Sequence, residues 1–190
     1  MAIWPTALIS VLFVVIHFAG VTWAANAARN REITANSTCG SPPEIFYSVV
    51  ERKKSPRYRI KSYCNATDSI LSHNASKMVD GKYETWWQSS ASIDKVSITI
   101  DLRGEYQKYY YVNKLVITFG EYYRPGQLVF YKSSDYGQSY QPWHYFVSTA
   151  DECQEKFNRP LESNPVRVDQ VLCTVYPTES KDINDVVSNL

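Results

Sequence analysis

The second half of the chain is built from short segments in which apolar and polar residues alternate. In residues 96–102, Val, Ile, Ile and Leu alternate with Ser, Thr and Asp, as in a strand with one buried face. Residues 109–119 are apolar on both faces around Leu115, which predicts a central strand. Because no amphipathic helix pattern separates these segments, the sequence predicts an antiparallel β-sandwich or barrel. Further strands are predicted at residues 128–132, 143–148 and 171–175, with turns at 124–126 and 134–137.

The first 25 residues contain no Lys, Arg, Asp or Glu, and residues 7–19 form an apolar run followed by small residues near Ala24. This pattern predicts a signal peptide over residues 1–25. The apolar run has 13 residues, too short for a bilayer core that requires about 20, and no later segment comes closer. We therefore predict secretion, with no transmembrane segment. Residues 26–176 are predicted to form one domain, loop-rich up to residue 92, and the polar residues 177–190 a mobile tail.

Four cysteines follow the leader, and if all are oxidised they allow three pairings. Locality in the chain favours Cys39 with Cys64 and Cys153 with Cys173. The competing hypothesis is a zinc site, which the absence of any C-x-x-C pair and the scarcity of His disfavour. Three glycosylation sequons lie in the loop-rich part of the chain and predict exposed positions; their acceptors are Asn36, Asn65 and Asn74.

The composition excludes several classes of function. The 20 basic and 19 acidic residues balance, and no arginine-rich arm is present, so nucleic acid is not a predicted partner. The catalytic motifs H-E-x-x-H, G-x-S-x-G and G-x-G-x-x-G are missing, so we predict that the chain is not an enzyme. His73 and His144 are the histidines beyond the leader, and we interpret them as a loop residue and a partly buried structural residue. The basic run at residues 51–59 is interpreted as a solvated loop, with binding of sulfated glycans as the alternative.

One segment has the pattern of a small-ion site. In residues 77–89 a tight turn at Asp80-Gly81 precedes two adjacent tryptophans. Such a turn can direct a carboxylate and backbone carbonyls toward one hard cation such as Ca²⁺. It can equally be an Asx turn in which Asp80 bonds its own backbone. Either way, the paired tryptophans are expected to anchor the loop, because indoles bury a large apolar area.

These residues resemble the laminin N-terminal domain, the LN module of laminins and netrins. The strongest match is W-W-Q-S after the D-G turn, and the matches occur in the family's order over about residues 34–176. The resemblance implies an all-β, jelly-roll β-sandwich of galactose-binding-like type, secreted, glycosylated and located in the extracellular matrix. The matching segments are residues 38–44, 78–81, 85–89, 96–102, 124–125, 133–137, 142–146 and 172–174.

The resemblance also implies a function and a cofactor. Family members act through protein contacts in cell adhesion, basement-membrane assembly or axon guidance, with other LN-type domains or cell-surface receptors as partners. A structural Ca²⁺ is implied, with four candidate ligand residues here: Lys77, Asp80, Lys82 and Thr85. Tyr and Arg predominate in binding hot spots, so Tyr122, Tyr123 and Arg124 are candidate contacts; alternatively they are solvent-facing turn residues. The alternative function is binding of a glycan, either heparan sulfate or a galactoside.

The sequence departs from the family pattern in two ways. Tyr47 and Lys61 stand where relatives commonly carry cysteines, which is consistent with the loss of one whole disulfide. Relatives also continue well past Cys173 with further strands and cysteine-rich repeats. We therefore expect the domain to be incomplete on its C-terminal side, as a splice form or as a piece of a longer chain.

Overall fold

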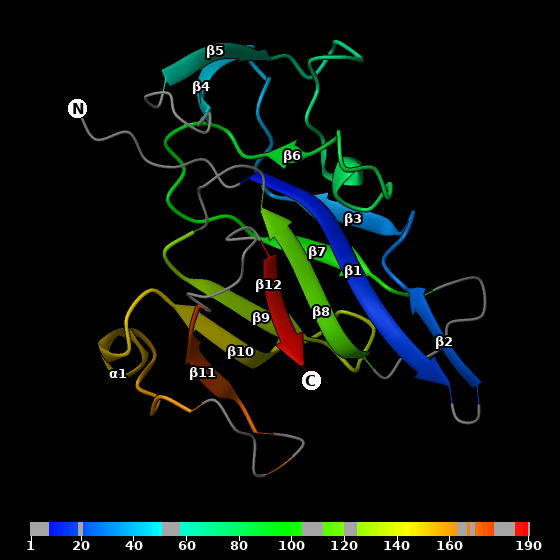
Figure 1. Cartoon of the computed structure of the whole chain (residues 1–190), viewed down its shortest axis with the longest axis vertical. Helices are drawn as coiled ribbons and strands as arrows, with labels where there is room; N and C mark the ends of the chain where they lie inside the picture. The colour runs from blue at the N-terminus through cyan, green and yellow to red at the C-terminus, as the bar shows by residue number, and fades with distance from the viewer. Residues whose placement is uncertain are drawn as a thin grey trace. The chain divides into compact units, whose positions relative to one another are not determined.

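The computed structural model describes residues 8–18, 21–50, 58–103, 112–119, 125–162, 167, 170–176 and 185–189 (Figure 1). Within these ranges the chain is mostly β-strand, with one short α-helix and one 3₁₀ helix, which confirms the all-β prediction. The chain divides into two compact units, residues 1–124 with 182–190, and residues 125–181. No helix in the described ranges has the length and apolar character needed to cross a membrane.

The largest sheet belongs to the first unit. Its strand order is β12-β8-β1-β2, and β6 also pairs with β1. Strand β8 therefore has a neighbour on each side, which confirms the central position predicted from its two apolar faces. All pairs in this sheet are antiparallel. The strands are β1 (Leu8–Phe18), β2 (Val21–Asn26), β6 (Trp87–Gln88), β8 (Val112–Phe119) and β12 (Asp185–Asn189).

Three strands of this sheet lie wholly or mostly in segments for which the sequence predicted something else, and β2 is in the predicted signal peptide up to residue 25. Strand β1 falls within the predicted signal peptide, and its apolar residues pair along β8. Strand β12 falls within the predicted mobile tail, where Val186 and Val187 pair with Ile117 and Val116 of β8. Adjacent β-branched residues favour a strand once a paired edge is present, although they are too few to predict one from sequence.

The same unit contains two separate two-stranded sheets and a 3₁₀ helix. Strand β3 (Glu32–Ala35) pairs antiparallel with β7 (Ile98–Asp101), and β4 (Glu44–Val50) pairs antiparallel with β5 (Tyr58–Cys64). The 3₁₀ helix η1 (Ala75–Met78) precedes the predicted ion-site loop. Short strands joined by long loops are what the sequence predicted for residues 26–92.

In the β4–β5 sheet, Tyr47 and Lys61 are directly opposite each other. These are the two positions at which relatives commonly carry cysteines. Residues opposite each other in an antiparallel pair lie within about 4.5–5.5 Å, close enough for a disulfide between suitable side chains. The register therefore agrees with the loss of one complete bridge rather than of two unrelated cysteines.

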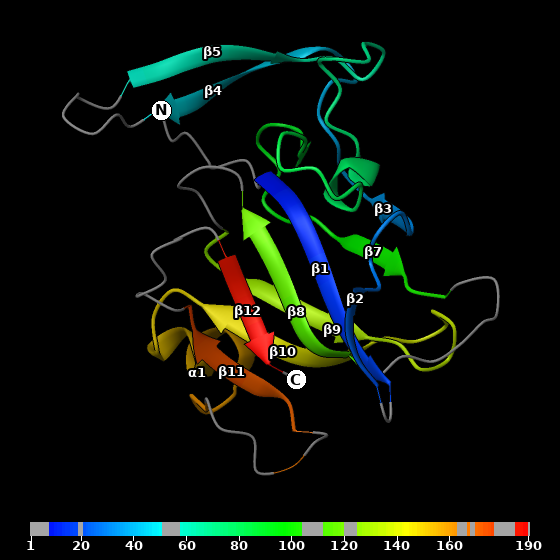
Figure 2. The same ribbon diagram turned by 45° about the vertical axis from the view of Figure 1, so that its right-hand side comes forward.

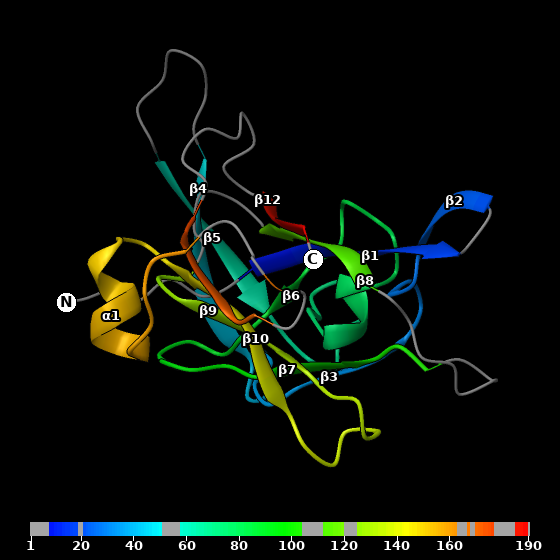
Figure 3. The ribbon, with the colours of Figure 1, turned by 90° about the horizontal axis from the view of Figure 1, so that it is seen from below.

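The second unit contains a three-stranded sheet in the order β11-β10-β9 and the helix α1 (Asp151–Phe157), which packs beside β10 (Figure 3). Strands β9 (Leu128–Lys132) and β10 (Gln141–Val147) are antiparallel, as predicted. Strand β11 (Leu172–Val175), however, runs parallel to β10, so the prediction of a purely antiparallel arrangement was wrong for this pair. The long connection through α1 allows the chain to cross over before it returns to the sheet.

The turn between β9 and β10 is stabilised by Asp135. Its carboxylate accepts hydrogen bonds from the Ser139 backbone N–H at 2.9 Å and from the Ser133 hydroxyl at 2.8 Å. The Ser139 hydroxyl also donates to this carboxylate, and this bond has the largest effect on its pKa. Together the hydrogen bonds lower the pKa of Asp135 to about 2. Tyr136 and Gly137 both adopt positive φ angles, of 61° and 85°. This confirms the turn predicted at residues 134–137.

Candidate interaction corner and cation loop

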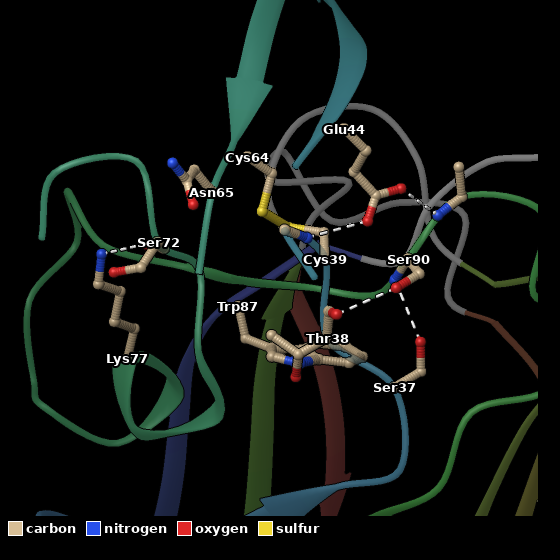
Figure 4. The surroundings of a disulfide bond; sticks show 12 residues. Ser37, Thr38, Cys39, Glu44, Cys64, Asn65, Ser72, Lys77, Trp87 and Ser90 are labelled. Atoms are coloured by element: carbon tan, nitrogen blue, oxygen red, sulfur yellow. Dashed lines mark hydrogen bonds between the residues drawn. A yellow bond between two sulfur atoms is a disulfide. The ribbon is translucent and has the colours of Figure 1, made fainter. Parts of the chain in front are cut away.

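A buried corner of the first unit brings together segments that are far apart in the sequence. Trp87 is completely buried in strand β6, and its indole N–H donates to the Thr38 hydroxyl at 3.0 Å (Figure 4). The Ser90 hydroxyl donates to the Thr38 carbonyl at 3.0 Å, and the Cys39 N–H donates to the Gln88 carbonyl at 2.9 Å. Trp87 thus anchors the loop, as predicted for the paired tryptophans.

The disulfide Cys39–Cys64 closes this corner, with a sequence separation of 25 residues and both side chains fully buried. Cys153 is bonded to Cys173 in the second unit, so the structure has the pairing that locality favours. Next to the first bridge, Gly40 has a φ of 95°, and a Cβ there would lie 2.4 Å from the Ala66 backbone nitrogen. Only glycine allows the two segments to approach so closely.

Glu44 ties the start of β4 to the same corner. One carboxylate oxygen accepts the Gly40 N–H at 3.0 Å and the other accepts the Ala91 N–H at 2.9 Å. A carboxylate that satisfies two otherwise unpaired backbone donors fixes the loops on either side. This role could not be predicted from the sequence, because a single Glu has no motif that would mark it as a link between loops.

The second tryptophan, Trp86, stacks on His73, with their ring centroids 4.3 Å apart. His73 is a loop residue, as predicted, but it is buried rather than solvated, and Phe46 meets it edge-on at 5.8 Å. Burial, and then the positive charge of Lys77, lower the pKa of His73 to about 4. His73 is therefore a neutral part of the core at physiological pH.

His144 has a similar structural role in the second unit. Its Nε2 lies 2.9 Å from the Thr174 hydroxyl, and its ring stacks on Phe146 at 4.1 Å. Burial lowers the pKa of His144 to about 4. The structure thus agrees with the interpretation of His144 as a buried, hydrogen-bonded residue.

These two histidines predict how stability depends on pH. Each takes up a proton near pH 6.5 when unfolded but only near pH 4 when folded, so the unfolded chain binds more protons between these values. Above pH 6.5 both histidines are neutral in the folded and in the unfolded chain, so we expect them to leave the free energy of unfolding independent of pH. It should fall toward pH 4 by up to about 1.4 kcal/mol per pH unit for each histidine. Urea unfolding at pH 7.0, 5.5 and 4.5 measures this slope; His144→Gln should reduce it, and an equal slope in the variant would contradict the assignment.

The predicted ion-site loop lies directly after η1. Asp80 accepts the Lys82 N–H at 2.9 Å through one carboxylate oxygen and the Thr85 hydroxyl at 2.7 Å through the other. The Thr85 hydroxyl also lies 3.3 Å from the Lys82 carbonyl oxygen. The structure therefore brings together three of the four predicted residues. Lys77 lies in η1, and its ammonium group donates to the Ser72 carbonyl.

The arrangement in this loop fits a hard cation in the type and spacing of its oxygen atoms. A carboxylate, a hydroxyl and a carbonyl oxygen lie about as far apart as neighbouring ligands of one Ca²⁺. The same contacts also form an Asx turn, which was the alternative interpretation. Across the described ranges, no three side chains of His, Cys, Asp or Glu gather to hold a metal. Carboxylate, hydroxyl and carbonyl oxygens are ligands of hard cations, and the calcium site itself stays a prediction.

The three predicted glycan acceptors lie on loops or at the end of a strand. Asn36 and Asn74 are exposed, and Asn65 is half-buried. Within two of the sequons the asparagine carbonyl accepts the hydroxyl of the third residue, Thr67 at 2.8 Å and Ser76 at 2.7 Å. Exposed acceptors of this kind are accessible for modification, and the glycosylation itself stays a prediction.

The β4–β5 sheet presents an exposed surface that the sequence did not single out. Ile45 and Tyr63 are directly opposite each other and 47% and 52% exposed, and Tyr47 on the same face is 57% exposed. The Lys61 ammonium group lies 5.4 Å from the centre of the Tyr63 ring. A shallow recess of about 310 Å³ opens beside this face; its lining residues are Pro43, Glu44, Ile45, Tyr63, Cys64, Asn65 and Leu71. Exposed tyrosines of this kind are enriched at protein interfaces.

The candidate contacts Tyr122, Tyr123 and Arg124 lie outside the described residues, as do residues 51–57 of the basic run. Arg59, the last residue of that run, and Lys61 lie on strand β5 and are exposed.

Comparison with known proteins identifies a family. The family described as Laminin N-terminal (Domain VI) matches residues 21–186. Human laminin subunit alpha-3 is 28% identical over 182 residues, which cover 83% of this chain and 5% of that protein. Human laminin subunit alpha-1 is 31% identical over 183 residues, covering 86% and 6%. Mouse netrin-4 is 30% identical over 156 residues, covering 80% and 23%. The chain thus spans a small part of the length of these relatives.

Proposed function

Since this chain belongs to the laminin N-terminal (domain VI) family, we propose that it is a secreted, non-enzymatic interaction module of the extracellular matrix or cell surface. The family match over residues 21–186 carries this proposal. Two buried disulfides support it, because such bonds form and persist in oxidising compartments. The finer fold that we propose is a jelly-roll β-sandwich of galactose-binding-like type.

The proposed partners are other laminin N-terminal domains or cell-surface receptors, bound through protein contacts in adhesion, matrix assembly or axon guidance. We place the contact at Tyr122, Tyr123 and Arg124, because Tyr and Arg supply much of the energy of binding hot spots.

Binding of the secreted chain to immobilised laminin and netrin N-terminal domains tests this function. We expect Tyr123→Ala and Arg124→Ala each to weaken binding at least about tenfold, as for residues at the centre of an interface. Tyr140→Ala is the matched control, because Tyr140 is an exposed tyrosine in another part of the chain, at 48% exposure. Unchanged affinity in both test variants would contradict the proposed contact surface. Absence of binding to every domain tested would contradict the proposed function.

We further propose that the loop after η1 holds a structural Ca²⁺, with Asp80, Thr85 and the carbonyl oxygens of Lys77 and Lys82 as ligands. The ion would supply positive charge that fixes the loop next to Trp87. At a calcium concentration 100 times its Kd, we expect the folded state to gain about 2.7 kcal/mol.

Thermal unfolding in calcium and in EDTA measures this gain. Asp80→Asn should abolish the difference, and Glu84→Gln, which removes an exposed carboxylate from the same loop, should keep it. Equal unfolding temperatures of the unaltered chain in calcium and in EDTA would contradict the proposed site.

The alternative function is glycan binding, with heparan sulfate as the ligand favoured by Arg59 and Lys61. These exposed residues continue the basic run 51–59 along strand β5, beside the exposed Tyr63. Heparin retention that falls steeply between about 50 and 200 mM salt, and that the double change Arg59→Ser and Lys61→Ser weakens, would favour this function. Retention unaffected by the double change would count against it.

A further inference from the structure

The predicted glycan acceptor Asn65 lies in the wall of an apolar recess beside the β4–β5 sheet. The two strands of this sheet lie side by side (Figure 2). The recess measures about 310 Å³, and all of its lining residues lie within residues 43–71. Three of the side chains that line it are large and apolar and yet exposed, namely Ile45 at 47%, Tyr63 at 52% and Leu71 at 37%. One short stretch of the chain therefore builds both the recess and the predicted site of modification.

The Cys39–Cys64 bridge sets the directions of the two side chains that flank Cys64. Cys64 is the last residue of strand β5, and its side chain is fully buried in the bridge (Figure 4). Successive side chains of a strand point to opposite faces, so Tyr63 and Asn65 point away from the bridge, toward the recess that both of them line. The aromatic ring and the acceptor are thus held on one face, two residues apart.

The Asn65 side chain is held by its oxygen atom. Its Oδ1 accepts the Thr67 N–H at 3.1 Å and the Thr67 hydroxyl at 2.8 Å. The Asn65 backbone N–H donates to the Leu71 carbonyl at 3.1 Å, which brings the following loop back to the recess. Within the described part of the chain Nδ2 makes no hydrogen bond, and this is the atom to which a glycan is attached. A sugar added there starts from a fixed position in the wall of the recess.

The other two predicted acceptors have different surroundings. The residue two places before Asn36 is Thr34, and the residue two places before Asn74 is Ser72, which is buried. The Oδ1 of Asn36 accepts the Ser97 N–H at 2.9 Å, and neither acceptor lines the recess. The acceptor that follows an exposed aromatic residue by two positions is therefore the one in the recess.

We propose that the first N-acetylglucosamine of a glycan on Asn65 packs against the Tyr63 ring and fills this recess. This inference rests on the proposed secretion, because such sequons are modified in secreted proteins. One side of the sugar ring presents C–H groups, whose partial positive charge complements the negative face of an aromatic ring. The Lys61 ammonium group lies over the same ring but does not line the recess, which leaves the recess side of the ring for the sugar.

The size of the recess and the covalent link both favour this occupant. Sites for small molecules have volumes of about 300–1,000 Å³, and this recess lies at the lower end of that range. A tethered group also has an effective concentration in the millimolar range, so a contact too weak to hold a free sugar is sufficient for an attached one. The packed sugar covers the exposed apolar side chains and keeps a partner protein away from this recess.

A cycle of variants of the secreted chain tests the contact. Intact mass first identifies the form with a sugar on Asn65, and that form is purified for the unaltered chain and for Tyr63→Ala. We expect Asn65→Gln to lower the unfolding temperature by about 2–4 °C, the shift expected for a contact of this kind in a chain of this length. In the Tyr63→Ala background, Asn65→Gln should leave the unfolding temperature unchanged. Asn74→Gln is the matched control, and its effect should be the same in both backgrounds.

Nuclear magnetic resonance of the unaltered chain gives a second measurement that needs no variant. The glycans are trimmed to one isotope-labelled N-acetylglucosamine at each site. The ring current of Tyr63 should move the protons of the sugar on Asn65 upfield, relative to the same sugar in the chain unfolded by urea. The sugar on Asn74 should show no such shift.

The outcomes separate this inference from the function on which it rests. Unshifted protons of the sugar on Asn65, or an equal effect of Asn65→Gln in both backgrounds, would overturn the inference. Weaker binding of a laminin or netrin N-terminal domain by Tyr63→Ala would overturn it in favour of a partner protein in the recess. A secreted chain with Asn65 unmodified would also overturn it, but would leave the extracellular function intact. If the chain were not secreted at all, the proposed function itself would fail.

Discussion

Replacing Trp87 with alanine is expected to lower the free energy of unfolding by about 3–5 kcal/mol, the usual cost of removing a fully buried tryptophan. The side chain is 0% exposed, and its N–H group bonds the Thr38 hydroxyl at 3.0 Å. The variant therefore leaves both a cavity and a buried hydroxyl without its donor. Chemical unfolding of the secreted chain measures the effect, with hydrogen exchange to locate it.

The controls distinguish this anchor from aromatic content in general. Tyr83→Ala removes an aromatic side chain from the same loop, but Tyr83 is 73% exposed, so the change should stay within about 0.5 kcal/mol. Trp87→Phe should fall between the two, because it keeps most of the apolar volume and loses the hydrogen bond. Similar stability of Trp87→Ala and Tyr83→Ala would contradict the role of Trp87 as the anchor of the corner.

Removing the Cys39–Cys64 bridge by a double change to alanine is expected to lower the free energy of unfolding by about 3–4 kcal/mol. In the chain-entropy description, a bond that closes a loop of this length restricts the unfolded chain by about that amount. The bridge spans a separation of 25 residues and lies beside the close approach of Gly40 to Ala66. Exchange of the backbone amides near Gly40 and Ala66 should also become faster.

The second disulfide supplies the matched control. Cys153 and Cys173 have a sequence separation of 20 residues, so their removal should cost a similar free energy. Its effect on hydrogen exchange should, however, centre on α1 and β11 rather than on residues 39–66. If the Cys39–Cys64 variant unfolded at the same denaturant concentration as the unaltered chain, the bridge would not be a main support of the corner.

Local pattern predicted much of the strand content correctly. Strand β9 has the predicted bounds, and β7, β8, β10 and β11 differ from their predictions by three residues or fewer at each end. These strands have periodic or dense β-branched residues, which is a local signal. The seven-residue helix α1 has no such signal, because two turns are too short to show an amphipathic period. The parallel direction of β11 is set by this crossover, which no local pattern of β11 itself reveals.

The candidate site was predictable to a smaller extent. The Asp80-Gly81 turn and the neighbouring tryptophans indicated a loop with a defined conformation. The structure brings Asp80, Lys82 and Thr85 together there. The bond from the Ala91 N–H to Glu44 and the stacking of His73 on Trp86 depend on loops that meet only in the folded chain. Such contacts between distant segments have no spacing in the sequence that could predict them.

We propose that this chain is an exported β scaffold, held by disulfides, that engages other proteins outside the cell. Peptide mapping of the secreted, unreduced chain by mass spectrometry tests it most directly. We expect no free thiol, with Cys39 linked to Cys64 and Cys153 linked to Cys173. Free thiols in the secreted product, or a bridge between the first and second pairs of cysteines, would contradict it.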